Sequence, residues 1–156
     1  SYYLGIDTSN YTTSAAVFDS GTGKVVHRKK LLPVAEGSLG LKQSDAVFAH
    51  VKQLPQILEE LFFALPSISL AAVGVSTRPR NAADSYMPCF LTGKLAASAI
   101  CSANRLPLYE FRTSAATSQR PCIQPVSWID AKGIYRLPLS GGTTECVHVA
   151  PDKQTV

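Results

Sequence analysis

The chain has 156 residues, of which 46% are hydrophobic and 17% charged, and its formal net charge is +4. This length is typical of one domain, or of one lobe of a larger protein, with a full hydrophobic core. Most of the surplus positive charge falls between Arg112 and Leu139, so the sequence contains no basic helix or stripe of the kind that binds nucleic acid.

The cysteines and the hydrophobic runs indicate a cytoplasmic protein. The 4 cysteines are widely separated and form no CxxC pair, which fits reduced thiols better than a zinc site or a disulfide framework. No apolar run is long enough to span a membrane, and the first residues read as a strand rather than as a signal peptide.

The first elements in the chain are strands. Tyr2 to Ile6 and Ser14 to Phe18 are apolar and β-branched or aromatic, and they flank a polar turn that begins at Asp7. Such a turn fits an ordinary hairpin, and it equally fits a site where N–H groups and hydroxyls meet a phosphate while the carboxylate holds a magnesium-bound water. A third strand of the same meander is predicted from Lys24 to Leu32.

A long amphipathic helix is predicted from Ser44, as its N-cap, to Leu65, with Asp45 in the first turn and Pro66 ending it. Pro55 predicts a kink or a break within it. The apolar positions repeat at intervals of three and four residues: Val47, Val51, Leu54, Leu58 and Leu61.

The later elements alternate between strand and helix. Leu70 to Ser76 reads as a strand buried on both faces, residues 77–88 as a loop, Leu91 to Ala103 as a helix and Pro107 to Phe111 as a strand. Three meandering strands followed by helix, strand, helix and strand predict an α/β, ribonuclease-H-like lobe. Two such lobes face each other in the architecture of actin, hexokinase and the heat-shock ATPases, and this analogy assigns no function.

Four motifs in this order resemble one family. They are GIDTSNYTTSAAV (Gly5 to Val17), the helix that carries His50, GVS (Gly74 to Ser76) and SGGTTE (Ser140 to Glu145). The chain resembles the N-terminal part of the threonylcarbamoyladenosine tRNA-modification family, formerly labelled O-sialoglycoprotein endopeptidase or glycoprotease. The resemblance covers Tyr2 to Phe111 and resumes at Leu139.

The resemblance implies a nucleotide site between two loops. In that family the lobes close over ATP or an adenylate intermediate, and a threonylcarbamoyl group passes to an adenosine of tRNA. By position, the phosphate would be bound by Asp7, Thr8, Ser9, Asn10, Ser140, Gly141, Gly142, Thr143 and Thr144. A plain hairpin turn is the alternative for the second loop. The implied partners are tRNA and a paralogous protein subunit, with a homodimer as a further alternative and no membrane.

Three departures from the family pattern indicate a divergent paralogue. The GPGL-type loop is replaced by a sequence containing Arg78 and Arg80, and the HxxxH pair that holds the family's iron or zinc is missing. We therefore expect this chain to bind no such metal, and we assign no catalytic residue. His50, on the amphipathic helix, is predicted to be hydrogen-bonded and half-buried. The chain ends about where the first lobe of the family ends, so we expect one lobe without its C-terminal partner.

The segment from Arg112 to Leu139 differs from the family in a way that suggests a change of reading frame. It contains the single tryptophan and most of the positive surplus. When Ala116 to Ile129 is back-translated and shifted by two bases, degenerate codons permit a histidine-led sequence that resembles the family's stretch from its second metal histidine. Our hypothesis is that small insertions or deletions in the gene produced the printed residues.

Three functional interpretations remain open at this point. The first is a nucleotide-dependent transferase acting on tRNA, or the N-terminal lobe of one. With the residues of this sequence, we expect it to be inactive. The second is a non-catalytic scaffold paralogue that pairs with a partner lobe through its helices. The third and weakest is the metallopeptidase of the old family label, because the sequence contains no HExxH motif and no nucleophile–base pair.

Overall fold

The computed structural model describes residues 1–9, 11–33, 42–79, 88–113, 135–141 and 143–149. In chain order its elements are β1 (Tyr2–Asp7), β2 (Thr12–Asp19), β3 (Val25–Leu31), α1 (Gln43–Phe63), β4 (Leu70–Pro79), α2 (Cys89–Asn104), β5 (Leu108–Thr113), β6 (Tyr135–Gly141) and β7 (Thr143–Val149). The predictions for the loop residues 34–41, for Arg80 and the following residues to 87, and for the frame-shifted stretch 114–134 lie outside the described residues.

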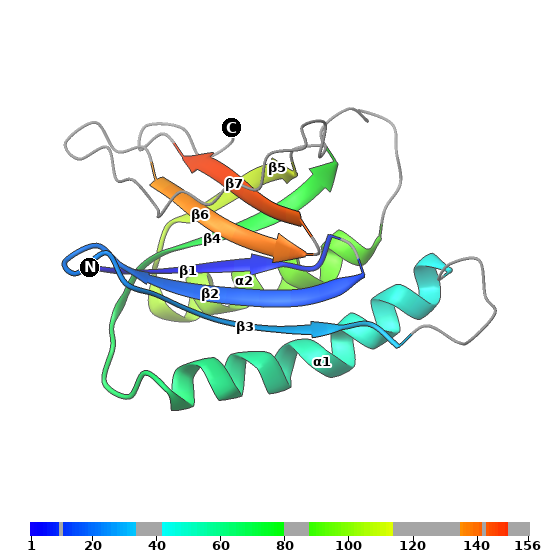
Figure 1. Ribbon diagram of the computed structural model, residues 1–156, viewed down its shortest axis with the longest axis horizontal. Helices are drawn as coiled ribbons and strands as arrows, with labels where there is room; N and C mark the ends of the chain where they lie inside the picture. Colours follow the sequence, from blue (N-terminus) through cyan, green and yellow to red (C-terminus); the bar gives the residue numbers. More distant parts are fainter. Residues whose placement is uncertain (10, 34–41, 80–87, 114–134, 142, 150–156) are drawn as a thin grey trace.

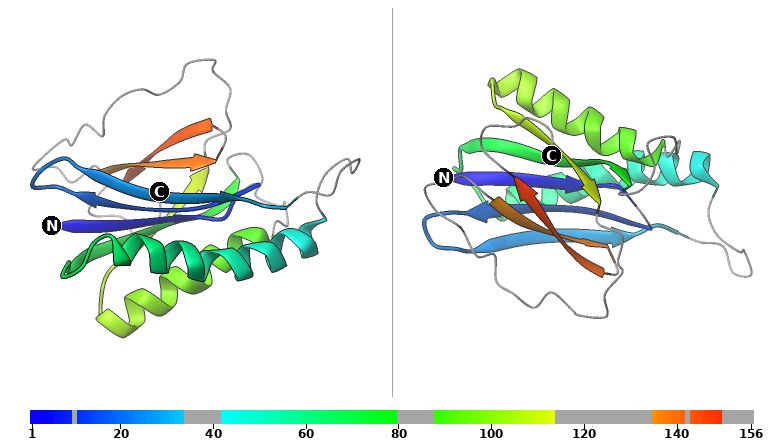
Figure 2. Two further views of the ribbon diagram at one scale, coloured as in Figure 1. Left: turned by 60° about the horizontal axis from the view of Figure 1, so that its bottom comes forward. Right: turned by 90° about the horizontal axis from the view of Figure 1, so that it is seen from above.

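Five of the strands form one sheet in the order β3-β2-β1-β4-β5. The first three strands are antiparallel, whereas β4 runs parallel to β1 and β5 parallel to β4. This arrangement confirms the predicted meander and the helical crossovers that follow it. Both helices cover one face of the sheet, and the β6–β7 hairpin lies over the other face (Figures 1 and 2).

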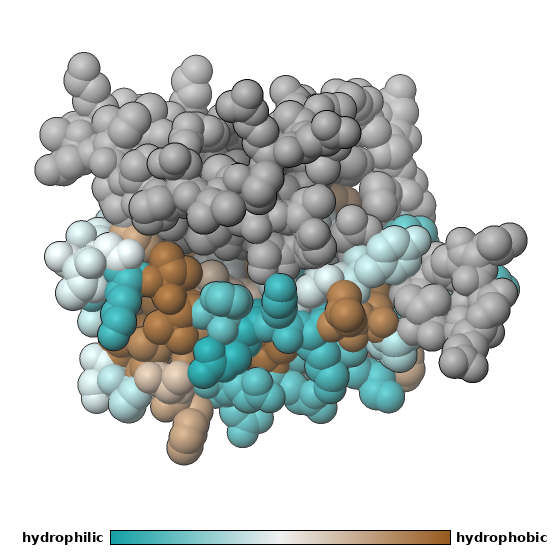
Figure 3. Space-filling model, in the orientation of Figure 1, coloured by the Kyte–Doolittle hydropathy of each residue, from teal (hydrophilic) through white to brown (hydrophobic). Residues whose placement is uncertain are grey.

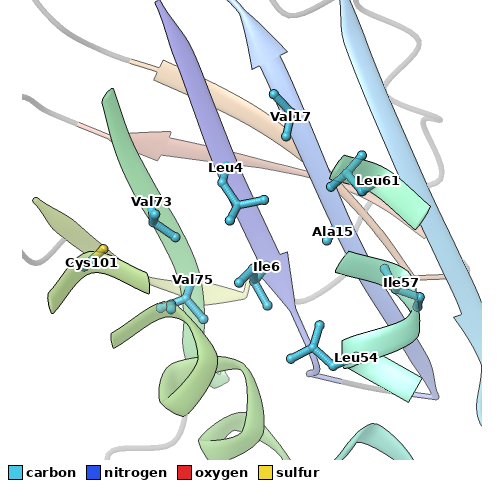
Figure 4. Close-up of a cluster of buried hydrophobic side chains, with 11 residues drawn as sticks. Leu4, Ile6, Ala15, Val17, Leu54, Ile57, Leu61, Val73, Val75 and Cys101 are labelled. Carbon is cyan, nitrogen blue, oxygen red and sulfur yellow. The ribbon is translucent and has the colours of Figure 1, made fainter. Parts of the chain in front are cut away.

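The main core lies between the sheet and the two helices, as Figure 4 shows. Alternation along each strand sends every second side chain to this face, so Leu4 and Ile6 of β1 meet Leu54 and Leu61 of α1. Burying a side chain of this size stabilises a fold by about 1.5–3 kcal/mol. The cluster consists of Leu4, Ile6, Ala15, Val17, Leu54, Ile57, Leu61, Val73, Val75, Ala97 and Cys101.

Helix α1 differs from the sequence prediction in three details. The N-cap residue is Lys42, without a side-chain hydrogen bond, so Ser44 lies inside the helix. Pro55 lies within the continuous helix, so the predicted break is wrong; Pro55 is exposed, and water can therefore satisfy the carbonyl group that loses its partner. Val51 is 49% exposed rather than part of the buried stripe, which instead contains Ala46, His50 and Gln53.

Strand β4 is longer than predicted, because Thr77 to Pro79 continue it instead of beginning a loop. The register with β5 explains the extension, since Arg78 and Pro79 pair with Arg112 and Thr113 after a shift at Ser76. Among the described residues, no helix is long and apolar enough to cross a membrane.

Candidate phosphate site

Asp7 lies at the carboxyl end of β1, the central strand, and only 3% of its surface is exposed. Its Oδ1 atom accepts a hydrogen bond of 2.8 Å from the backbone N–H of Ser9. Burial raises the pKa of Asp7 above its ordinary value, and the contributions of Ser9 and of the Ser76 hydroxyl oppose that rise. The strand end therefore contains a carboxyl group with few solvent contacts.

Two serines flank Asp7 on the neighbouring strands. Ser14 of β2 is its register partner, and Ser76 of β4 follows Val75, which pairs with Ile6. Both serines are buried, and neither Oγ atom makes a hydrogen bond of acceptable geometry, although the Ser76 hydroxyl is close enough to lower the pKa of Asp7. Both hydroxyls therefore lie beside the carboxyl group of Asp7, where each can donate or accept a hydrogen bond.

Thr8 faces the opposite side of the sheet and fastens the turn to α2. Its hydroxyl donates to the carbonyl oxygen of Cys89 at 2.8 Å and accepts from the N–H of Gly93 at 3.1 Å. A Cβ atom on Gly93 would lie 2.9 Å from Thr8 Oγ1, so this close approach requires glycine. The Thr8 hydroxyl therefore holds the turn in place instead of pointing toward a phosphate on the sheet face.

The second predicted loop lies between the paired strands β6 and β7, an arrangement that fits both a phosphate-binding loop and a plain hairpin turn. Ser140 pairs with Thr144 and Gly141 with Thr143, whereas Gly142, like Asn10 of the first turn, lies outside the described residues. Strand β6 lies against β1 and β2 (Figure 1), on the face of the sheet that carries Asp7. Anion binding between the two segments stays a prediction.

His50 belongs to the other face, and the prediction that it is half-buried is wrong. Its side chain is fully buried, and its Nδ1 atom lies 2.7 Å from the hydroxyl oxygen of Thr13. Thr13 donates to Gln53 Oε1 at 3.0 Å, and Gln53 Nε2 donates to the carbonyl oxygen of Leu31. Because the threonine has one proton, Nδ1–H of His50 is the donor to Thr13. This network joins α1 to β2 and β3, away from the candidate site.

The prediction that this chain binds no transition metal stays a prediction. No group of three or more His, Cys, Asp or Glu side chains among them lies close enough to hold a metal ion. Cys89 contacts the turn, with its sulfur 3.9 Å from the carbonyl oxygen of Ser9. Burial, together with the nearby charge of Asp7, raises the pKa of the Cys89 thiol, which keeps the thiol protonated and weakly nucleophilic.

Comparison with known proteins supports the fold. No family model and no curated protein matches the chain. Among solved structures, YeaZ from Pseudomonas aeruginosa superposes with a TM-score of 0.53 and 14% identity over 72% of this chain and 44% of that one. The chain has a ribonuclease-H-like fold.

A second solved structure, titled an uncharacterised protein with similarity to peptidase YeaZ from Pseudomonas aeruginosa, gives a TM-score of 0.56 at 14% identity. The match covers 98% of this chain and 68% of that one. The chain thus spans less than half of the length of the first structure and about two thirds of the second. At this identity the likeness establishes the fold alone.

Ser14 and Ser76 were not predicted as candidate site residues, although Ser14 lies within GIDTSNYTTSAAV and Ser76 within GVS. Their positions in the sequence could have indicated them, because each places a hydroxyl group within an otherwise apolar strand. Whether those hydroxyls share a face with Asp7 depends on register, which sequence periodicity alone does not supply.

Proposed function

We propose that this chain is the phosphate-binding lobe of a cytoplasmic, nucleotide-dependent tRNA-modification protein of the threonylcarbamoyladenosine type. One observation supports the proposal most: buried Asp7 lies between two buried serines, Ser14 and Ser76, on the sheet face covered by the glycine-containing hairpin. The YeaZ-like fold and the four ordered motifs are consistent with this interpretation.

The residues on this face suit a magnesium-bound phosphate. A carboxylate oxygen can accept a hydrogen bond from a magnesium-bound water, and serine hydroxyls can donate to phosphate oxygens. Backbone N–H groups near Gly141 would add further donors if the hairpin tip turns toward the ligand. An adenylate supplies a group already activated for transfer, and this chain would bind and orient its phosphate.

A calorimetric titration with Mg²⁺–ADP, and separately with AMP, tests the proposal. We expect weak binding by the wild-type chain and a loss of at least tenfold in Asp7→Asn, because the variant removes a charge-assisted hydrogen bond. Asp19→Asn is the matched control, since Asp19 also ends a strand but its carboxylate lies in the exposed turn with Gly21 and Thr22. Equal affinities in all three proteins, or no binding by the wild type, would refute the proposal.

A non-catalytic scaffold is the second candidate, and the exposed faces of the helices favour it. Large apolar side chains lie in the N-terminal halves of two helices that pack side by side, and Figure 3 shows apolar surface near both ends of α1. The exposed fractions are 64% for Phe48, 49% for Val51, 57% for Leu91 and 70% for Leu95. Apolar surface of this kind is typical of protein contacts.

Sedimentation analysis separates the two candidates. If the helices form an interface, the protein should self-associate, and Phe48→Ser combined with Leu95→Ser should shift it to monomer. Leu31→Ser is the control, because Leu31 is equally exposed at 70% but lies on β3 instead of on a helix. A monomer without added partner, together with nucleotide binding, would favour the transferase lobe over a self-pairing scaffold.

A further inference from the structure

Lys29 lies in one row with the candidate phosphate site. On edge strand β3 it pairs with Ser14, which in turn pairs with Asp7 on β1. Lysine, serine and aspartate therefore occupy the same level of three adjacent strands, and Ser76 continues the row on β4.

Alternation along β3 decides which way Lys29 points. Val26 packs into the core beneath the helices, and the ammonium group of Lys30 donates to Gln56 Oε1 of α1 at 3.4 Å. Side chains at even-numbered positions of β3 thus face the helices, and Lys29 faces the other side, as Asp7 does. Adjacent strands are about 4.8 Å apart, so Lys29 and Asp7 are separated by about 10 Å, a gap that a lysine side chain and one phosphate group can fill together.

The charges of this row favour an anion at the end formed by Lys29, on the edge strand β3. Lys29 is exposed, and the one ion pair found among the described residues joins Lys94 to Glu110, well away from it. Asp7 is buried, and no cation contacts it within the described part of the chain. A ligand that approaches from the β3 edge of the sheet therefore meets the ammonium group of Lys29 first, the hydroxyl of Ser14 next and the carboxyl group of Asp7 after that.

We propose that Lys29 is a ligand-binding residue of this site, and that it binds the terminal phosphate of a nucleoside diphosphate while the hydroxyl of Ser14, its partner on the neighbouring strand, donates to another oxygen of that phosphate. This inference rests on the proposed function and adds the residue that supplies the positive charge. Lysine suits the role because its ammonium group binds phosphate as a compact point charge with three donors.

A purely structural role for Lys29 is the competing explanation. Lysines on edge strands keep sheets from pairing edge to edge, and Arg28, Lys29 and Lys30 together could do only that. The register separates the two explanations, because a lysine that only protects the edge can lie on either face of the strand. Lys30 is therefore a matched control: it has the same charge on the same edge but faces α1.

The experiment compares Lys29→Met with Lys30→Met by calorimetric titration with Mg²⁺–ADP and with inorganic pyrophosphate. We expect Lys29→Met to weaken both ligands at least tenfold and to reduce the salt dependence of binding, because one ammonium–phosphate contact is lost. Lys30→Met should bind within about twofold of the wild type, and Ser14→Ala should weaken binding severalfold.

A second measurement uses the unmodified protein. Acetylation of lysines followed by peptide mapping should show that pyrophosphate protects Lys29 but not Lys30. If Asp7→Asn abolishes binding while Lys29→Met binds normally, Lys29 has no such role and the proposed function stands. If the two lysine variants weaken binding equally, the effect is general electrostatics, which also overturns the inference. If the wild type binds neither ligand, the proposed function is wrong, and this inference falls with it.

Discussion

Substituting Gly93 tests how the structure positions the first turn. In Gly93→Ala the new Cβ atom would lie 2.9 Å from Thr8 Oγ1, 3.3 Å from Val75 Cγ2 and 3.4 Å from Ile6 Cγ2. The first distance is too short for any real contact, and the hydroxyl cannot move freely because it also donates to the Cys89 carbonyl oxygen at 2.8 Å. Thr8 itself is fully buried, so its displacement would disturb the packing around the end of β1.

The expected cost follows from opposing terms. Overpacking of this kind destabilises a protein by about 1–3 kcal/mol. Weakening two hydrogen bonds of Thr8 adds about 0.5–1.5 kcal/mol each, whereas replacing glycine by alanine inside a helix gains about 1 kcal/mol. We therefore expect Gly93→Ala to lower the free energy of unfolding by about 1–5 kcal/mol despite its better helix propensity.

Chemical denaturation followed by circular dichroism measures this change, and two further variants control it. Ala99→Gly, at an exposed position of the same helix, calibrates the propensity term at about 1 kcal/mol. In a Thr8→Ala background, which removes the clashing oxygen, the cost of Gly93→Ala should fall by at least about 1 kcal/mol. A Gly93→Ala protein as stable as the wild type, or one with the same cost in both backgrounds, would refute this account.

Three other predictions concern Asp7, Thr13 and the gene. Burial raises the pKa of Asp7 in the folded protein above its unfolded value of 3.8. Protonation of Asp7 therefore contributes its whole stabilisation below pH 3.8, and this contribution is lost as the pH rises through the folded pKa. In thermal unfolding, Asp7→Asn should be more stable than the wild type at about pH 7, and the difference should vanish near about pH 3. Thr13→Val removes the hydrogen bonds to His50 and Gln53 and should cost about 1–3 kcal/mol in denaturant unfolding, whereas a cost below about 0.5 kcal/mol would contradict the network. Sequencing of the coding DNA should show open alternative frames across codons 112–139 that spell the family's residues, and a stop codon in those frames would end that hypothesis.

The sequence by itself determined the elements and their order. Alternation of apolar residues predicts the strands, and a spacing of three and four predicts α1, because those periods follow from local backbone geometry. Short turns between the first strands and helices between the later ones were enough to predict the meander and the ribonuclease-H-like class of the fold. Asp7 was also identifiable, because a carboxylate that ends an apolar strand before a polar turn is a local pattern.

Only the tertiary structure decided which side chains share a face. Thr8 and Asp7 are adjacent in sequence, yet one fastens the turn to α2 and the other lies with Ser14 on the opposite face. Pairing between strands sets this register, and a shift of one residue would reverse every side chain. The burial of His50 and the position of Lys29 beside the candidate site depend on the same long-range pairing, so no window of sequence could contain them.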